Sequence, residues 1–152
     1  MATLDSTTLL GQPAPDFSLS DADGKTWSLA TLLGAPAVFI FYPGDMTPGC
    51  TVQLCAVRDD WAKFSQAGIK VFGINQGSAK SHTTFQKAHS FPFPLLIDSK
   101  KEMAEAYGAI MHILGLKLIR RTVVAIDETG KVVYFKAGMP KNADILKVFN
   151  VK

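Results

Sequence analysis

The chain has 152 residues, of which 47% are hydrophobic and 19% are charged, and its formal net charge is +3. This length suits a single domain over residues 1–152 that buries about two-thirds of its unfolded surface without disulfides. The Lys and Arg residues are scattered along the chain, which argues against nucleic-acid binding, and no apolar run reaches the roughly 18 residues of a membrane-spanning helix.

Residues 1–10 have neither the basic region nor the long apolar core of a secretory signal. The chain holds two cysteines, Cys50 and Cys55. Two cysteines in a chain without a signal indicate a reducing compartment, and catalytic, redox or metal chemistry more than a structural disulfide. We therefore expect a cytoplasmic protein that uses its cysteines chemically.

The first half of the chain alternates predicted strands and helices. Residues 16–19 and 25–28 flank an Asp-Gly turn and predict a short β-hairpin. The continuous apolar run 36–42 predicts a strand that is covered on both faces, and 69–74 predicts a second one. Between them, apolar residues at steps of three and four predict a helix over about 47–67.

The second half continues this alternation and ends on a hairpin and a helix. We expect helices at 79–89 and 100–107, strands at 94–98, 122–127 and 131–136, and a last helix that Asn142 caps and that runs to 149. The apolar stretch 109–116 is predicted to pack over the sheet as a loop or helical turn. Together the elements predict an α/β fold with a central mixed sheet, helices on both faces and an N-terminal hairpin. Sites in such sheets lie at the carboxyl ends of strands, which singles out the loop after residue 42.

Cys50 and Cys55 both fall on the helix that follows this loop. Helix geometry places Cα atoms five residues apart at about 8–9 Å. That distance exceeds the roughly 7 Å limit for a disulfide. The two cysteines therefore cannot bridge inside an intact helix, and a bridge between them requires the helix to open.

The residues before Cys50 predict that it lies in the first turn of the helix. Thr47 is a good N-cap, Pro48 suits the first helical position, and Gly49 lets another group approach the backbone closely. A helix N-terminus favours a thiolate over a thiol by about 0.3–1 kcal/mol. Making the thiolate the majority form at neutral pH takes roughly 2.7 kcal/mol, so we expect a cation near Cys50.

Two other interpretations of the cysteines stay open at this point. Cys50 could be a small buried hydrophobe, as free cysteines often are. A zinc site is weakly supported, because His82, His89 and His112 are remote from the cysteines and no Cys-x-x-Cys pair is present. We expect His82 and His89 on exposed helix faces without a catalytic role, and we expect neither a metal nor an organic cofactor.

The stretch Pro43-x-x-x-Thr47-x-x-Cys50 resembles the active-site signature of peroxiredoxins, which are thiol peroxidases with a thioredoxin-like fold. A second cysteine five positions further on resembles the peroxiredoxin Q, or bacterioferritin comigratory protein, branch. The similarity extends over nearly the whole chain, including 11–17, 93–98 and 121–127. The resemblance implies a thioredoxin-like fold and a monomer.

The resemblance also implies roles for five residues. Cys50 would be the peroxidatic cysteine, which attacks the peroxide O–O bond and becomes a sulfenic acid, and Cys55 the resolving cysteine, which condenses with it to a disulfide. Thr47 would hydrogen-bond the thiolate and the peroxide, Pro43 would shield the sulfenic acid, and Arg121 would be the expected cation. A thioredoxin or glutaredoxin would then reduce the disulfide.

Other positions refine this assignment. Arg120 adjoins Arg121, and the spacing of the family's strand selects Arg121, which leaves Arg120 as a solvated surface charge. Gln53 stands where the branch usually carries a glutamate, and its neutral amide removes a negative charge one turn from the thiolate. The stretch 109–116, together with Met46, is a candidate apolar collar for organic hydroperoxides, although packing over the sheet is the favoured interpretation.

The expected activity is reduction of hydrogen peroxide and organic hydroperoxides. Two alternatives use the same cysteines. One is a general disulfide oxidoreductase, although the Cys-x-x-Cys spacing is missing. The other is a non-catalytic redox sensor that signals through a Cys50–Cys55 switch.

Overall fold

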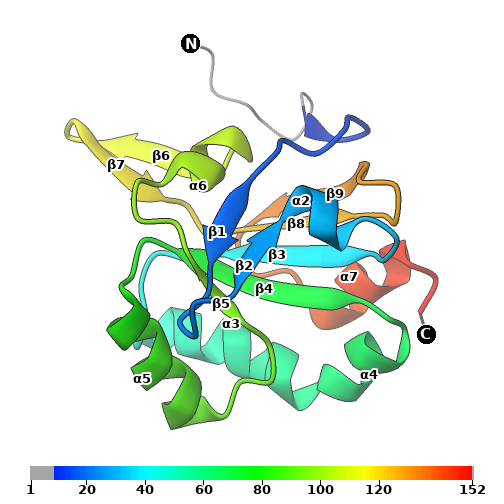
Figure 1. Ribbon diagram of the computed structural model, residues 1–152, viewed down its shortest axis with the longest axis horizontal. Coiled ribbons are helices and arrows are strands. Elements are labelled where there is room, and N and C mark those ends of the chain that lie inside the picture. Colours follow the sequence, from blue (N-terminus) through cyan, green and yellow to red (C-terminus); the bar gives the residue numbers. More distant parts are fainter. Residues whose placement is uncertain (1–8, 152) are drawn as a thin grey trace.

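A five-stranded mixed β-sheet lies at the centre of the molecule (Figure 1). Its order is β5-β4-β3-β8-β9, with β3 at Ala37–Phe41, β4 at Lys70–Asn75, β5 at Leu95–Ile97, β8 at Thr122–Ile126 and β9 at Val132–Ala137. The structure is a computed structural model that describes residues 9–151. Residues 1–8, which make up most of the N-terminal segment that lacks signal character, therefore lie outside the described residues.

Strand β3 has a neighbour on each edge, and this pairing positions the site. It pairs with β4 in parallel and with β8 in antiparallel orientation. The β3–β8 register places Phe41 opposite Thr122. Because Tyr42 follows Phe41 and Arg121 precedes Thr122, the register brings the loop after β3 next to Arg121.

Helices cover both faces of the sheet, as predicted. Their bounds are α2 Leu29–Leu32, α3 Pro48–Asp59, α4 Trp61–Gln66, α5 Ala79–His89, α6 Glu102–Ala106 and α7 Asn142–Val148. In Figure 1, α3, α4 and α5 lie below the sheet, and α2 and α6 lie above it. All five residues of β3 are buried, with Phe39 and Phe41 in one hydrophobic cluster and Val38 and Ile40 in the other. A continuous apolar run is thus what a strand between two helical layers requires.

The predicted N-terminal hairpin is confirmed. Strand β1, Ser18–Ser20, pairs in antiparallel orientation with β2, Thr26–Ser28. Asp21 organises the turn, because its Oδ1 accepts hydrogen bonds from the backbone N–H groups of Asp23 and Lys25. Gly24 completes it with φ of 84°.

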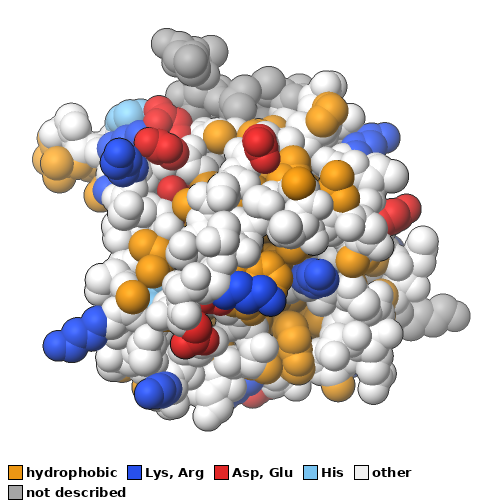
Figure 2. Space-filling view, in the orientation of Figure 1, with side chains coloured by type: hydrophobic (Ala, Val, Ile, Leu, Met, Phe, Trp, Pro, Cys, Tyr) orange, Lys and Arg blue, Asp and Glu red, His pale blue; other side chains and the backbone are white. Residues whose placement is uncertain are grey.

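The prediction of a loop or helical turn at 109–116 is wrong, because this stretch begins a second hairpin. Strand β6, Ile110–Ile113, pairs with β7, Leu116–Ile119. Leu114 and Gly115 form the tight turn, with φ of 52° and 78°. Leucine is unusual at such a turn position, so the sequence pattern did not predict the hairpin. The hairpin projects from the body (Figure 1), and hydrophobic side chains lie at its projecting end (Figure 2). The side chain of Leu114 is 97% exposed.

The helix predicted over 47–67 is broken into α3 and α4 at Asp60.

The prediction that Asn142 caps the last helix is also wrong, because Lys141 holds the cap position. The Asn142 side chain instead donates to the Ala56 carbonyl and to Asp60 Oδ2, each at 2.9 Å. The Ala56 carbonyl in the last turn of α3 thus accepts the Asn142 amide in addition to the backbone N–H of Asp60.

Positive and negative side chains are interspersed on the face shown in Figure 2. Within residues 9–151, no helix is both long enough and apolar enough to cross a membrane. Among the same residues, no group of three or more His, Cys, Asp or Glu side chains is arranged to hold a metal ion.

Candidate active site

The signature residues lie on the loop between β3 and α3 and on the first turn of α3. Thr47 is the N-cap with extended backbone, and Pro48 is the first helical residue, both as predicted. The Thr47 hydroxyl does not cap the helix but donates to the Gly44 carbonyl at 3.0 Å. That bond uses the hydroxyl proton, so Thr47 Oγ1 offers its lone pairs to an O–H donor. Pro43 is exposed on the same loop.

Cys50 and Arg121 meet at the start of α3. Cys50 is fully buried, and Arg121 Nη2 donates to its Sγ at 3.3 Å. The other terminal nitrogen, Nη1, donates to Gln53 Oε1 at 2.9 Å. The neutral amide of Gln53 therefore orients the guanidinium toward the sulfur, a role that its sequence position did not reveal. The structure thus brings together the thiol and the cation that the sequence argument required.

Gly49 makes room for this arrangement. A Cβ added at Gly49 would lie 3.0 Å from Arg121 Nη2, which is tighter than ordinary van der Waals contact. A glycine at this position therefore lets the guanidinium lie against the first turn of α3.

Cys55 lies on the same helix as Cys50, as predicted. It is half-buried and packs against the hydrophobic cluster that α3 shares with the sheet. Both cysteines are free, and α3 is continuous from Pro48 to Asp59. At a Cα separation of about 8–9 Å in an intact helix, the two thiols form a bond only after α3 opens.

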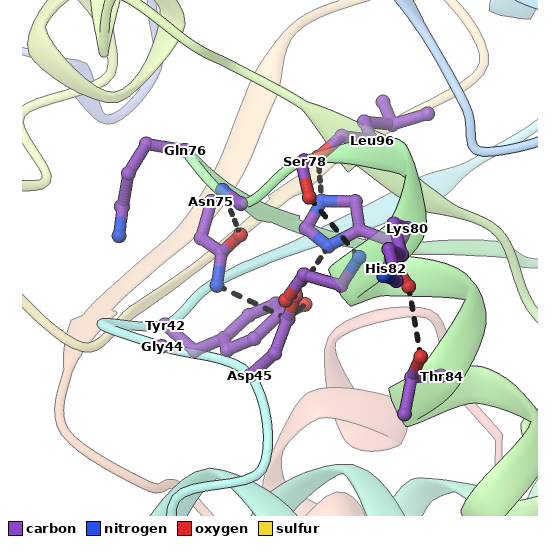
Figure 3. A network of polar contacts seen from close by, with 12 residues as sticks. Tyr42, Gly44, Asp45, Asn75, Gln76, Ser78, Lys80, His82, Thr84 and Leu96 are labelled. Atoms are coloured by element: carbon purple, nitrogen blue, oxygen red, sulfur yellow. Dashed lines mark hydrogen bonds and ion pairs between the residues drawn. The ribbon is translucent and has the colours of Figure 1, made fainter.

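A buried polar network, which sequence analysis missed, surrounds Asp45 on the same loop (Figure 3). Asp45 Oδ2 lies 2.6 Å from His82 Nδ1 and accepts from Ser81 Oγ at 2.6 Å. Asp45 Oδ1 accepts from the Tyr42 hydroxyl at 2.6 Å and from Asn75 Nδ2 at 3.3 Å. Burial raises the pKa of Asp45, but the hydrogen bonds from His82, Ser81 and Tyr42 outweigh it and leave that pKa lowered. Burial and the adjacent Asp45 charge raise the pKa of Tyr42 well above its ordinary value, which keeps the phenol a donor.

Three sequence-based expectations about charged side chains are corrected here. His82, expected on an exposed face, is fully buried, and its position three residues before the buried Phe85 was the available signal. His89, expected to be exposed, is half-buried with its ring stacked on a phenylalanine. Arg120, expected to be solvated, is half-buried and donates to a backbone carbonyl at 3.1 Å.

Comparisons with known proteins agree with this site. The family model described as AhpC/TSA family matches residues 10–135. Peroxiredoxin Q of Oryza sativa subsp. japonica, a chloroplastic protein, is 43% identical over 124 residues, which are 82% of this chain and 57% of the relative. A putative peroxiredoxin bcp of Coxiella burnetii is 40% identical over 127 residues, covering 81% of this chain and 84% of the relative. The chain thus spans little more than half the length of the plant relatives that it matches.

Solved structures extend the likeness to the fold. Peroxidoxin BcpB of Mycobacterium tuberculosis superposes with a TM-score of 0.84 at 31% identity, over 93% of this chain and 96% of that one. The bacterioferritin comigratory protein of Xanthomonas campestris, studied for alkyl peroxide reduction, gives 0.81 at 28% identity, over 88% and 90%. The predicted thioredoxin-like fold is confirmed by these likenesses. With the signature, the buried thiol and its arginine in place, the chain belongs to the AhpC/TSA family of peroxiredoxins, in the peroxiredoxin Q or bacterioferritin comigratory protein branch.

Proposed function

We propose that the protein is a thiol peroxidase that reduces hydrogen peroxide and organic hydroperoxides. The observation that carries the proposal is the contact of the Arg121 guanidinium with the buried Cys50 sulfur in the first turn of α3. The helix N-terminus and the guanidinium both stabilise negative charge at that sulfur. The alkyl peroxide reduction studied in the Xanthomonas campestris relative supports organic hydroperoxides as substrates.

The first step is attack by the Cys50 thiolate on the nearer peroxide oxygen. An S–O bond forms, the O–O bond breaks with its electron pair, and the departing oxygen takes a proton to leave as water or an alcohol. Arg121 stabilises the charge that develops on the transferred oxygens. Thr47 Oγ1, whose proton is given to Gly44, accepts a hydrogen bond from the peroxide O–H, while Pro43 shields the resulting sulfenic acid.

The second step joins the two cysteines. The Cys55 thiol attacks the sulfur of the Cys50 sulfenic acid, an S–S bond forms and water leaves. Because the two sulfurs lie on one intact helix, α3 opens locally before this step. A dithiol reductant, thioredoxin or glutaredoxin, then restores both thiols by exchange.

The deciding experiment couples the purified protein to thioredoxin, thioredoxin reductase and NADPH. Adding hydrogen peroxide is expected to start NADPH consumption, and the Cys50→Ser variant is expected to show none. Reduction of insulin without peroxide turnover would favour a general disulfide oxidoreductase instead. Oxidation of Cys50 without turnover by any dithiol reductant would favour a redox sensor.

We also propose that the protein works as a monomer in a reducing compartment such as the cytoplasm. The use of only two cysteines in the given sequence, both placed for redox chemistry, supports a reducing compartment. Light scattering of the reduced and oxidised protein tests the first part, because a mass of twice 16.4 kDa would contradict it. Fractionation of the source cells tests the second.

A further inference from the structure

The network around Asp45 ties the loop before Cys50 to elements other than α3. Its carboxylate and its imidazole are almost completely buried, with the Asp45 side chain 3% exposed and the His82 side chain 0% exposed. Tyr42 follows β3, Asn75 ends β4, and His82 lies in the first turn of α5 (Figure 3). Ser81 lies in the same turn of α5. The contacts of Asp45 with Asn75, Ser81 and His82 therefore tie the loop to the sheet and to α5 across 30 to 37 residues of chain.

Hydrogen-bond roles set the charge of the pair. His82 Nε2 lies 2.9 Å from the carbonyl oxygen of Leu96, which can only accept, so this nitrogen carries a proton. Asp45 accepts from Ser81 and Tyr42 as well as facing His82 Nδ1, and these donors keep it ionised. The proton between Asp45 and His82 therefore belongs to the ring, and the pair is a buried carboxylate and imidazolium.

The chain between Asp45 and Thr47 depends on this anchor. Met46 has φ of 63°, a left-handed conformation that a residue with a side chain keeps only where its surroundings hold it. The hydrogen-bond network fixes Asp45, the residue before Met46. The hydroxyl of Thr47, the residue after Met46, donates a hydrogen bond to the Gly44 carbonyl. Fixing Asp45 therefore fixes the direction in which Thr47 enters α3.

Gly77 closes the network from the opposite side. A Cβ added at Gly77 would lie 2.7 Å from Asp45 Oδ2 and 3.0 Å from His82 Cε1. The Gly77 N–H also donates to Asn75 Oδ1 at 2.8 Å. The loop after β4 thus packs directly on the ion pair, which leaves Asp45 little freedom to move.

We propose that the Asp45–His82 ion pair is a positioning device for peroxide attack, with His82 acting through the loop that carries Pro43 and Thr47. This inference rests on the proposed peroxidase function. The pair holds the loop that leads to Cys50 in place while α3, to which it is not bonded, opens for disulfide formation. A buried charge that loses its partner is costly, so the anchor persists through the cycle.

The experiment separates the two chemical steps. Rapid-quench mass spectrometry of proteins that also carry Cys55→Ser gives the second-order rate constant for oxidation of Cys50 by hydrogen peroxide. We compare His82→Gln and Asp45→Asn with His89→Gln, a matched control on the same helix whose ring stacks on Phe91 outside the network. The rate of disulfide formation is then measured in the same three variants with Cys55 present.

His82→Gln and Asp45→Asn are expected to slow oxidation roughly 10- to 100-fold, as misplacement of reacting groups does, and to leave disulfide formation within about twofold. His89→Gln is expected to keep both rates. If His82→Gln does not fold, Asp45→Asn, which keeps the size of the side chain, decides alone. Unchanged oxidation, or an equal fall in both steps, overturns the positioning role. A wild-type protein whose Cys50 is not oxidised by peroxide overturns the proposed function as well, and so the two failures are distinguishable.

¹⁵N NMR of the wild-type protein provides a second readout that needs no variant. The Nε2 of His82 is expected to carry a proton, because it faces the carbonyl oxygen of Leu96. A bare Nε2 would contradict the hydrogen-bond network.

Discussion

The two segments that flank Cys50 are held in opposite ways. Before it, the loop is fastened by buried, charge-assisted hydrogen bonds at Asp45 to the sheet and to α5. After it, α3 is held by its own backbone bonds and by the apolar packing of Leu54 and Val57. Three side-chain hydrogen bonds add to this packing, from Arg121 to Gln53, from Arg58 to the His89 carbonyl and from Asn142 to the Ala56 carbonyl. Cys55 lies in the middle of α3, where its side chain is half-buried. Within the described part of the chain, it makes no charge-assisted hydrogen bond like those of Asp45.

This difference matches the two demands of the proposed cycle. Peroxide attack needs a fixed geometry around Cys50, whereas disulfide formation needs the helix between Cys50 and Cys55 to open. The backbone bonds, apolar packing and partly exposed hydrogen bonds of a single helix give way locally at lower cost than a buried ion pair. The molecule therefore combines a rigid loop before Cys50 with a helix, α3, that can unfold locally after it.

Removing the resolving thiol gives the largest expected effect. Cys55→Ser is expected to keep the fast first oxidation of Cys50 and to lose recycling by thioredoxin, because no second thiol on α3 can close the disulfide. Thioredoxin-coupled NADPH consumption measures this loss. Sustained turnover by the variant, without added small thiols, would show that opening of α3 is not needed.

Amide hydrogen exchange tests the contrast between the two segments directly. In the oxidised protein, residues 50–57 are expected to lose protection because the Cys50–Cys55 bond does not fit an intact helix. Residues 75–82, which hold the anchor, are expected to keep their protection. A fully protected α3 in the disulfide form would contradict local opening.

Arg121→Gln is expected to slow Cys50 oxidation by roughly 10²–10³-fold, the range for losing one group that stabilises transition-state charge. The two terminal nitrogens of Arg121 contact Cys50 and Gln53 at the same time. Arg121→Lys keeps the positive charge but has a single nitrogen, so it is expected to recover only part of the oxidation rate. Stopped-flow oxidation of the reduced protein provides the measurement. Full activity of Arg121→Gln would remove the guanidinium from the mechanism.

Gly49→Ala is expected to change stability and activity in opposite directions. Alanine in place of glycine favours the helix by up to about 1 kcal/mol. The added Cβ, however, would meet Arg121 Nη2 at 3.0 Å and displace the guanidinium, so a fall of a few-fold in Cys50 oxidation is expected. Urea unfolding and stopped-flow oxidation measure the two effects, and a faster oxidation would contradict the steric argument.

The smallest expected effect is on stability in acid. Because the pKa of Asp45 is lowered from 3.8 in the folded protein, its carboxylate stabilises the fold above that value. This contribution is lost as the pH falls below 3.8 through the folded pKa. The urea midpoint of the wild type is therefore expected to fall more steeply below about pH 4 than that of Asp45→Asn. Parallel curves would show that Asp45 is not stabilised as an anion.

Local sequence patterns predicted most of the fold and half of the site. Continuous apolar runs marked β3 and β4, because a strand between two helical layers buries both faces. The order Thr47, Pro48, Gly49 marked the start of α3, since cap and first-turn preferences act within a few residues. The β6–β7 hairpin was missed because Leu114 occupies a turn position that usually takes Asn or Gly.

The sequence by itself determined which cysteine starts a helix and that its neighbour five residues on cannot bond to it there. Those conclusions depend only on helix geometry and on residues adjacent in the chain. Only the tertiary structure decided that Gln53 orients Arg121, that Asn142 binds the end of α3, and that Asp45 meets a buried His82. These contacts join segments that are 37 to 86 residues apart in the chain. They depend on the register of the strands and on how the helices pack against the sheet, and a local sequence pattern contains no information on either.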